Sequence, residues 1–133
     1  MKKMLGLIFL GILTLVGCSP KEEQLTIKVG MVTDSGSIND KSFNQGSWEG
    51  ILNFQSQHEN VEVQYIQPSG ETLQDYTNAI DNLILAGNEV IVMPGFKFEE
   101  TANVVAKQYP EIEFILIDGQ PSKNGEYVTH DNV

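Results

Sequence analysis

Arginine is missing from this 133-residue chain, whose eight basic residues, all lysines, face 18 aspartates and glutamates. The formal net charge of −10 leaves no basic face of the kind that nucleic-acid binding normally needs. The chain also lacks the guanidinium groups that bind phosphates in a bidentate manner. The composition therefore argues against nucleic acid as a partner and against phosphate-rich ligands, while much of the acidity serves solubility.

Cysteine and long apolar runs are also scarce. The one cysteine, Cys18, has no partner for a disulfide within the chain. The N-terminal apolar run covers residues 4–16, which is short for a membrane-spanning helix but typical of a signal-peptide core. Two lysines precede this run and the letters LVGC end it, a pattern that resembles the bacterial lipobox.

This pattern predicts a lipoprotein. We expect residues 1–17 to be a signal peptide, Cys18 to be lipidated, and residues 18–25 to be a polar tether. Acyl chains on Cys18 would hold the protein on the extracytoplasmic face of the cell membrane without spanning it. The alternative is a plain signal peptide or short anchor with an incidental cysteine.

Metal ligands and catalytic nucleophiles are few. His58 and His130 lie far apart, without ligand-like spacing to acids, so we expect no metal site. No nucleophile stands beside a base, and Ser69 is a poor candidate for a nucleophile at a strand end. We therefore expect neither catalysis nor a cofactor.

Residues 26–133 alternate between strand-like and helix-like segments. Apolar β-rich runs predict strands at 26–32, 61–67, 89–95 and 112–118, and helical spacing predicts helices at 43–57, 71–87 and 97–109. Trp48 has the spacing of a core residue, and Ser42 with Gln45 fits a capping box. The alternation predicts an α/β fold with a doubly wound parallel sheet in the strand order 2-1-3-4, and residues 126–133 look extended.

The carboxyl ends of the predicted strands gather residues suited to a ligand. Asp34, Gly95 and Asp118 follow the first, third and fourth strands, and ligands bind at this edge of open parallel sheets. Phe43 can offer its ring to a flat group, and Asn44 carries both a donor and an acceptor. Each residue also has a structural interpretation, such as a loop cap, a hydrophobic staple or a turn.

The letters GMVTDSGSINDKSFNQGSWEGI, residues 30–51, resemble the signature of the basic membrane protein family of bacterial solute-binding lipoproteins, which includes purine nucleoside receptors. The lipobox, the strand order and LIDG at residues 116–119 agree with this resemblance. It implies a type I periplasmic-binding-protein-like fold with the ligand between two lobes. It also implies a non-enzymatic binding component that works with an ABC transporter permease.

The resemblance also implies roles for the five residues at the sheet edge. Asp34 and Asp118 would bind ribose hydroxyls, and Phe43 would stack on a purine base whose edge Asn44 contacts. Gly95 would lie beside the ligand, although the proline before it departs from the family pattern.

Length sets this chain apart from the family, whose members are more than twice as long. We therefore expect residues 26–133 to form the N-terminal lobe, with the second lobe absent because the chain is a fragment or the gene is truncated. Other interpretations stay open: a regulatory or interaction lipoprotein on this scaffold, or a protein that binds another small solute such as a sugar. A phosphorelay receiver and a hydrolase are weaker, because the third predicted strand ends without an acid and Ser69 stands alone.

Overall fold

The structure, a computed structural model, describes residues 25–133. The expected signal peptide, Cys18 and nearly all of the expected tether lie outside the described residues, so these expectations stay predictions. The elements in chain order are β1 (Ile27–Val32), α1 (Phe43–Gln57), β2 (Val61–Ile66), α2 (Leu73–Leu85), β3 (Val90–Pro94), the 3₁₀ turn η1 (Phe96–Phe98), α3 (Glu99–Gln108), β4 (Glu113–Ile117), β5 (Ser122–Lys123) and β6 (Glu126–Tyr127).

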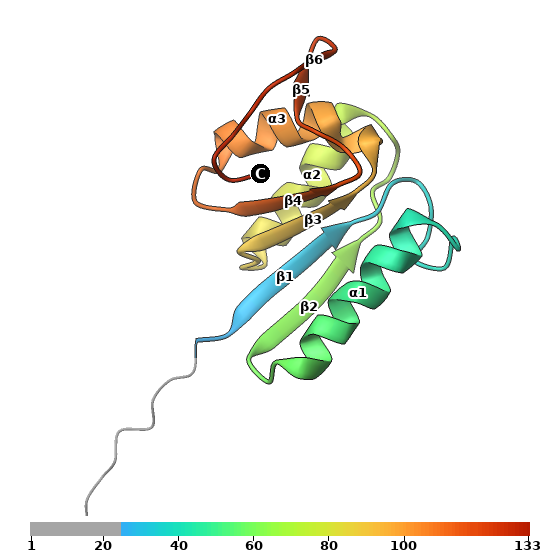
Figure 1. The fold of residues 1–133 in the computed structure, drawn as a ribbon, viewed down its shortest axis with the longest axis vertical. Helices are drawn as coiled ribbons and strands as arrows, with labels where there is room; N and C mark the ends of the chain where they lie inside the picture. Colours follow the sequence, from blue (N-terminus) through green and yellow to red (C-terminus); the bar gives the residue numbers. More distant parts are fainter. Residues whose placement is uncertain (1–24) are drawn as a thin grey trace, which may run out of the picture.

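The main sheet has four parallel strands in the order β2-β1-β3-β4. Met31 pairs with Val92 and Val92 pairs with Ile115, so three of the strands lie in close register. The predicted doubly wound α/β fold and its strand order are confirmed. Helix α1 lies on one face of the sheet, and α2 and α3 lie on the other (Figure 1).

Alternate side chains of the strands enter two separate cores. On the α2/α3 face, Ile91 and Met93 of β3 are fully buried. On the α1 face, Val92 packs with Met31 and Ile51. Because both faces receive apolar residues, these strands read as nearly continuous apolar runs, as strands of a parallel sheet normally do.

The ends of the first two helices are fixed by different side chains. The Ser42 side chain makes no capping hydrogen bond, so the capping box that we expected there is wrong. The Asp40 carboxylate instead accepts hydrogen bonds from the backbone N–H groups of Ser42, Asn44 and Gln45 at 2.8, 3.3 and 3.1 Å. Helix α2 has a complete capping box, formed by Thr72 and Asp75.

The C-terminal segment folds back on the sheet instead of forming one extended strand. Strands β5 and β6 form a short antiparallel hairpin. Farther along, the Asn132 carbonyl accepts a 2.8 Å hydrogen bond from the Phe114 N–H in β4. The Asn132 amide donates to the carbonyl oxygens of Ala106, Tyr109 and Ile112 at 3.3, 3.1 and 3.0 Å. Asn132 thereby joins the end of α3 to the start of β4.

Trp48, expected in the core, is half-buried on α1. Its ring contacts the Tyr65 ring edge-on, with centroids 5.1 Å apart. It borders the core of the α1 face and does not lie inside it. No helix in the part of the chain that the structure describes is long and apolar enough to cross a membrane.

Candidate functional site

The carboxyl ends of β1, β3 and β4 lie side by side and carry the predicted site residues. Asp34 follows β1, Gly95 follows β3 and Asp118 follows β4. The Gly95 N–H donates to the Ile117 carbonyl at 2.8 Å, which holds the β3 and β4 turns together. Asp34, Gly95 and Asp118 therefore lie on one edge of the sheet, as the sequence predicted.

The backbone conformation at two of these turns is unusual. Gly95 has φ of 106°, a region that side chains rarely adopt, so a residue with a Cβ would be strained there. Asp118 is exposed and has φ of 55°, which is uncommon for a residue other than glycine, asparagine or aspartate. Gly95 is itself buried, whereas Asp118 is exposed at the end of β4.

Asp34 is held by its own loop. Its Oδ1 accepts hydrogen bonds from the Gly36 N–H at 2.7 Å and from the Asn44 amide at 2.6 Å. The Asp34 N–H donates to Asn44 Oδ1 at 3.3 Å. A Cβ on Gly36 would lie 2.8 Å from Asn44 Nδ2 and 2.9 Å from Asp34 Oδ1, so only glycine allows this close approach.

Asn44 thus orients Asp34 in this structure. The residue is buried, and both ends of its amide are directed at Asp34. The contact with a base edge that the resemblance implies stays a prediction. In the arrangement described, the clear contribution of Asn44 is to fix the carboxylate beside it.

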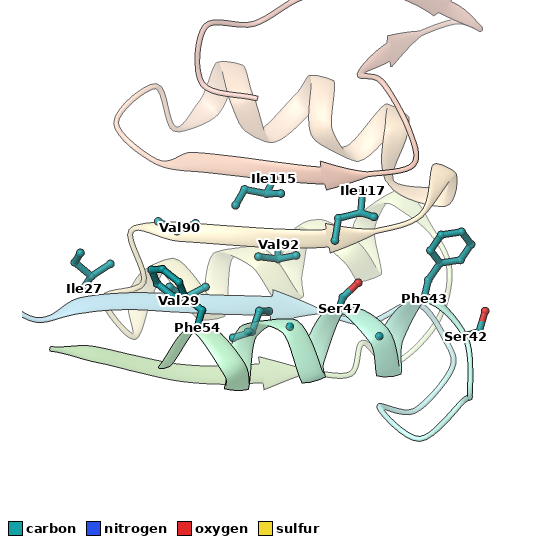
Figure 2. A pocket seen from close by; sticks show the side chains of 13 residues that line it. Ile27, Val29, Ser42, Phe43, Ser47, Phe54, Val90, Val92, Ile115 and Ile117 are labelled. Atoms are coloured by element: carbon teal, nitrogen blue, oxygen red, sulfur yellow. The ribbon is translucent and has the colours of Figure 1, made fainter. Parts of the chain in front are cut away.

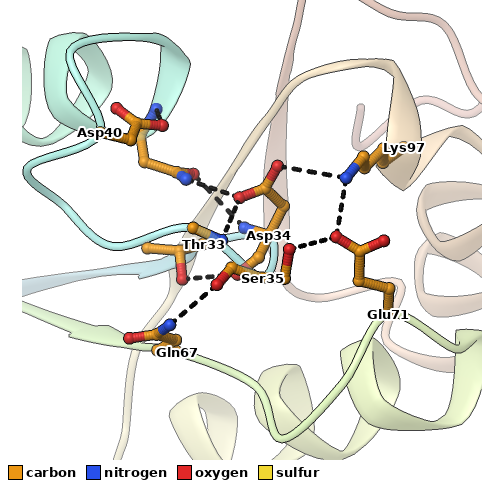
Figure 3. A network of polar contacts seen from close by, with 9 residues as sticks. Thr33, Asp34, Ser35, Asp40, Gln67, Glu71 and Lys97 are labelled. Carbon is orange, nitrogen blue, oxygen red and sulfur yellow. Dashed lines mark hydrogen bonds and ion pairs between the residues drawn. The ribbon is translucent and has the colours of Figure 1, made fainter.

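Lys97, in the η1 turn after β3, meets two carboxylates at this edge. Its Nζ lies 2.7 Å from Glu71 Oε1 and 3.6 Å from Asp34 Oδ2. The Ser35 hydroxyl also donates to Glu71 Oε1. Figure 3 shows that Lys97 and Ser35 connect Asp34 and Glu71 in one network across the β1 and β2 loops.

The pKa shifts in this network favour full ionisation. The hydrogen bond from Lys97, with a second from Ser35, lowers the pKa of Glu71 below its ordinary value. The same bond to Glu71 raises the pKa of Lys97 above its ordinary value. At neutral pH the network therefore carries charged groups of both signs.

Sequence reasoning missed Lys97 and Glu71. Lys97 stands two residues after Gly95, and Glu71 follows Gly70 in the loop after β2, so both follow strand ends that the apolar runs reveal. Their position after predicted strands was the signal that could have identified them as candidate site residues. Their pairing across 26 residues of sequence was not visible in any local pattern.

Phe43, the first residue of α1, is 44% exposed. It borders a groove of about 1000 Å³ between α1 and the α1 face of the sheet. The groove is lined mainly by apolar side chains of both, among them Val29, Ile51, Phe54, Val90, Val92, Ile115 and Ile117. Phe43 lies at the end of the groove near the carboxyl ends of the strands, and Phe54 lies toward the other end (Figure 2). Phe43 therefore borders both the groove and the strand-end edge.

Acidic and histidine side chains do not gather into a metal-binding group. Within residues 25–133, no three His, Cys, Asp or Glu residues are placed to hold a metal ion.

Comparison with known proteins adds the family. The family model Bmp, described as ABC transporter substrate-binding protein PnrA-like, matches residues 27–133. The chain belongs to this family. Among the curated relatives, the "Transcriptional activator protein med" of Bacillus subtilis (strain 168) is 31% identical over 127 residues, which is 95% of this chain and 39% of that protein. The "ABC transporter nucleoside-binding protein BmpA" of Lactococcus lactis is 27% identical over 69% of this chain and 26% of that protein.

Solved structures agree on the fold. The Bmp chain matches a solute-binding protein of an ABC transporter system from Aeropyrum pernix K1 with a TM-score of 0.61 and 29% identity, covering 80% of this chain and 27% of that one. It matches a transcriptional activator of the comK gene from Bacillus halodurans with a TM-score of 0.60 and 25% identity, covering 72% and 31%. The chain thus spans well under half the length of each of these proteins.

Proposed function

We propose that this Bmp chain is the N-terminal lobe of a lipid-anchored substrate-binding protein that captures a purine nucleoside for an ABC importer. One observation carries the proposal: the Asp34 carboxylate is fixed through Oδ1, yet its side chain stays 27% exposed at the strand-end edge. A fixed, accessible carboxylate is suited to binding a solute and needs no reacting group beside it.

The chemistry at this edge fits a ribose and a base. Ionised carboxylates only accept hydrogen bonds, so Asp34 and Asp118 select hydroxyl donors, each such bond contributing about 1.5–3 kcal/mol. Phe43 has an exposed ring near the same edge. Stacking of a base on that ring contributes about 1–3 kcal/mol. Asn44 orients Asp34, and Gly95 is the family position beside the ligand, at the same edge of the sheet.

Charge at the edge disfavours a phosphate. Asp34, Glu71 and Asp118 outnumber Lys97, whose charge is already matched by two carboxylates. A 5′-phosphate placed there would be repelled, since like charges close together cost free energy. Nucleosides should therefore bind more tightly than the corresponding monophosphates.

The rest of the proposal concerns organisation. Residues 1–17 form the signal peptide, lipidated Cys18 and residues 18–25 form the anchor and tether, and residues 26–133 form the first lobe of a two-lobed protein. Its partners are the membrane and an ABC permease. Replacing Cys18 with alanine should abolish labelling by a fatty-acid probe and leave unprocessed precursor, and unchanged labelling would contradict the anchor.

Calorimetry on the full-length gene product tests the ligand. Adenosine, guanosine and inosine should release heat, and their monophosphates should bind more weakly. Phe43→Ala should weaken the binding of all three nucleosides by about 5- to 150-fold, as loss of one stacking contact predicts. Phe54→Ala is the matched control, because Phe54 is 46% exposed on the same helix but lies toward the far end of the groove. If a sugar or an amino acid releases heat and nucleosides do not, the proposal of a nucleoside ligand is refuted, whereas the proposal of solute binding stands.

A regulatory role on the same scaffold is the second candidate. It is favoured by two matches whose names describe transcriptional activators, one of which covers 95% of this chain. This candidate predicts that no nucleoside, sugar or amino acid shifts the melting temperature of the full-length gene product. A shift with any of these solutes would favour the binding role.

A further inference from the structure

We infer that Lys97 contacts the ligand and that Lys97 and Asp34 together hold one hydroxyl group of the bound solute. In this arrangement Asp34 Oδ2 accepts the hydroxyl hydrogen, and Lys97 Nζ donates a hydrogen to the hydroxyl oxygen. The inference rests on the proposed function for the identity of the solute, a nucleoside, and the hydroxyl is one of its ribose hydroxyls.

The first step concerns which oxygen of Asp34 is available. Oδ1 already accepts from the Gly36 N–H and the Asn44 amide, at 2.7 and 2.6 Å. A carboxylate oxygen has about two lone-pair sites, so these two donors occupy Oδ1. A ligand hydroxyl is therefore directed to Oδ2, which is the oxygen that faces Lys97 (Figure 3).

The second step is the distance between Oδ2 and Nζ. At 3.6 Å the two atoms attract as an ion pair but lie beyond the 2.7–2.9 Å that is usual for a charge-assisted hydrogen bond. A hydroxyl that binds Oδ2 comes within reach of Nζ as well. Because a hydroxyl both donates and accepts, it can satisfy the two atoms at once, whereas neither a second carboxylate nor a second ammonium can.

The third step is that Lys97 is held in place with donors to spare. Its Nζ has three N–H bonds, and Glu71 Oε1 takes one of them at 2.7 Å. Ser35 donates to the same Glu71 oxygen, so Glu71 is itself connected to the loop that carries Asp34. The Lys97 side chain is 40% exposed, so a ligand at this edge can reach it.

This arrangement makes one hydroxyl decisive for specificity. A ligand that lacks it leaves Oδ2 and Nζ partly desolvated without their bridging group. Sites built around such polar atoms discriminate strongly against the analogue that lacks the matching group. Lys97 would then set which sugar the protein accepts.

Calorimetry of the full-length gene product with inosine and its 2′-, 3′- and 5′-deoxy analogues tests the inference. In the wild type, loss of one of the three hydroxyls should lower affinity about 10-fold or more. In Lys97→Met the affinity for inosine should fall, and the penalty for removing that same hydroxyl should shrink to a few-fold. The other two penalties should stay unchanged.

Two control variants distinguish a direct contact between Lys97 and the ligand from a purely structural role of Lys97. Lys123→Met removes the same charge in strand β5 and should change none of the ratios. Glu71→Gln weakens the contact that holds Lys97 but keeps the ammonium near Asp34. It should therefore retain most of the discrimination between inosine and the deoxy analogue that Lys97→Met loses. Equal loss of affinity for inosine and all its analogues in Lys97→Met would show a purely structural role and overturn the inference.

The two proposals fail in different ways. Tight nucleoside binding with unchanged hydroxyl ratios in Lys97→Met overturns the inference alone. If wild-type protein gives no heat with nucleosides, the nucleoside proposal fails, and the same variants are measured on whichever sugar binds. Binding only of solutes without hydroxyls, or of no solute, overturns both.

Discussion

The two faces of the four-stranded sheet differ in how completely helices cover them. On the covered face, α2 and α3 pack over the strands, and Ile80, Leu83 and Ile91 are fully buried. On the open face α1 packs alone, and Ile115 stays 48% exposed in the groove beside it. Strands of parallel sheets are normally buried on both sides. The open face therefore carries apolar side chains typical of a core, but α1 covers them only in part.

This difference separates the apolar groove from the polar groups of the candidate site. A large apolar cavity is the usual first candidate for a ligand site, but such sites also need a few convergent polar groups. The groove on the open face is lined mainly by aliphatic and aromatic side chains. The convergent polar groups lie at the strand ends, around Asp34 and Lys97. Phe43 borders both regions.

The largest test of the two faces compares isoleucines in neighbouring strands. Ile91→Ala should cost about 2–5 kcal/mol of unfolding free energy, because Ile91 is fully buried on the covered face. Ile115→Ala should cost no more than about 1 kcal/mol, since half of that side chain is already in water on the open face. Urea denaturation of both variants measures the contrast. Equal costs would mean that the open face is covered in solution.

The next test uses two glycines and predicts opposite signs. A Cβ on Gly30 would lie 3.0 and 3.1 Å from the two terminal methyl carbons of Leu83, so Gly30→Ala should destabilise by about 1–3 kcal/mol. A Cβ on Gly50 meets nothing within 4 Å, so Gly50→Ala should stabilise α1 by about 0.5–1 kcal/mol. Thermal melts of the pair report the signs. A loss of stability in Gly50→Ala would show that the groove holds a close neighbour.

The helix on the open face should depend strongly on its cap. Asp40→Ala removes an acceptor from three backbone N–H groups and should cost about 1–2 kcal/mol. Thr72→Ala, the matched change at α2, should cost less, because the Thr72 hydroxyl accepts from one backbone N–H and α2 is better packed. Urea denaturation of both variants at neutral pH ranks them, and a larger cost for Thr72→Ala would contradict the comparison.

The contribution of Asp40 should also depend on pH. Partial burial raises the pKa of Asp40, but hydrogen bonds from the N–H groups of Gln45, Ser42 and Asn44 outweigh it and lower the pKa below 3.8. A carboxyl group whose pKa is lowered on folding stabilises above its unfolded pKa, and that contribution is lost as the pH falls through the folded value. The difference in stability between wild type and Asp40→Ala should therefore be full at pH 6 and shrink below pH 3.8. A difference that stays constant to pH 2 would exclude ionised Asp40 as the source.

The smallest effect should come from Tyr76, at the boundary between the covered face and the strand-end edge. Its hydroxyl is buried and has no hydrogen-bond partner among residues 25–133, and burial, followed by the charge on Glu71, raises its pKa. Tyr76→Phe keeps the ring contact with Phe98 and removes the unpaired hydroxyl. Stability should change by less than about 0.5 kcal/mol, or rise slightly. If thermal melts show that Tyr76→Phe loses well above about 1 kcal/mol of unfolding free energy, the hydroxyl has a hydrogen-bond partner.

The strand order and the predicted edge followed from the sequence because apolar runs mark strands and strand ends follow them. Asp34, Gly95 and Asp118 could be placed on one edge for that reason. The side-chain arrangement could not be predicted. An exposed lysine such as Lys97 gives no local sign of its distant partners, and the orientation of Asn44 depends on a close approach that only Gly36 permits. The cap of α1 was misassigned to Ser42 because a serine three residues before a glutamine fits the usual pattern, whereas Asp40 reaches the same N–H groups from farther back.

Asn132 bears on aggregation. Strand β4 is at the edge of the sheet, and a strand edge with free backbone groups is a template for pairing with another chain. The Asn132 carbonyl takes up the Phe114 N–H on that edge, while its amide secures the segment against the end of α3. The segment that carries Asn132 thus shields part of the β4 edge from intermolecular strand pairing.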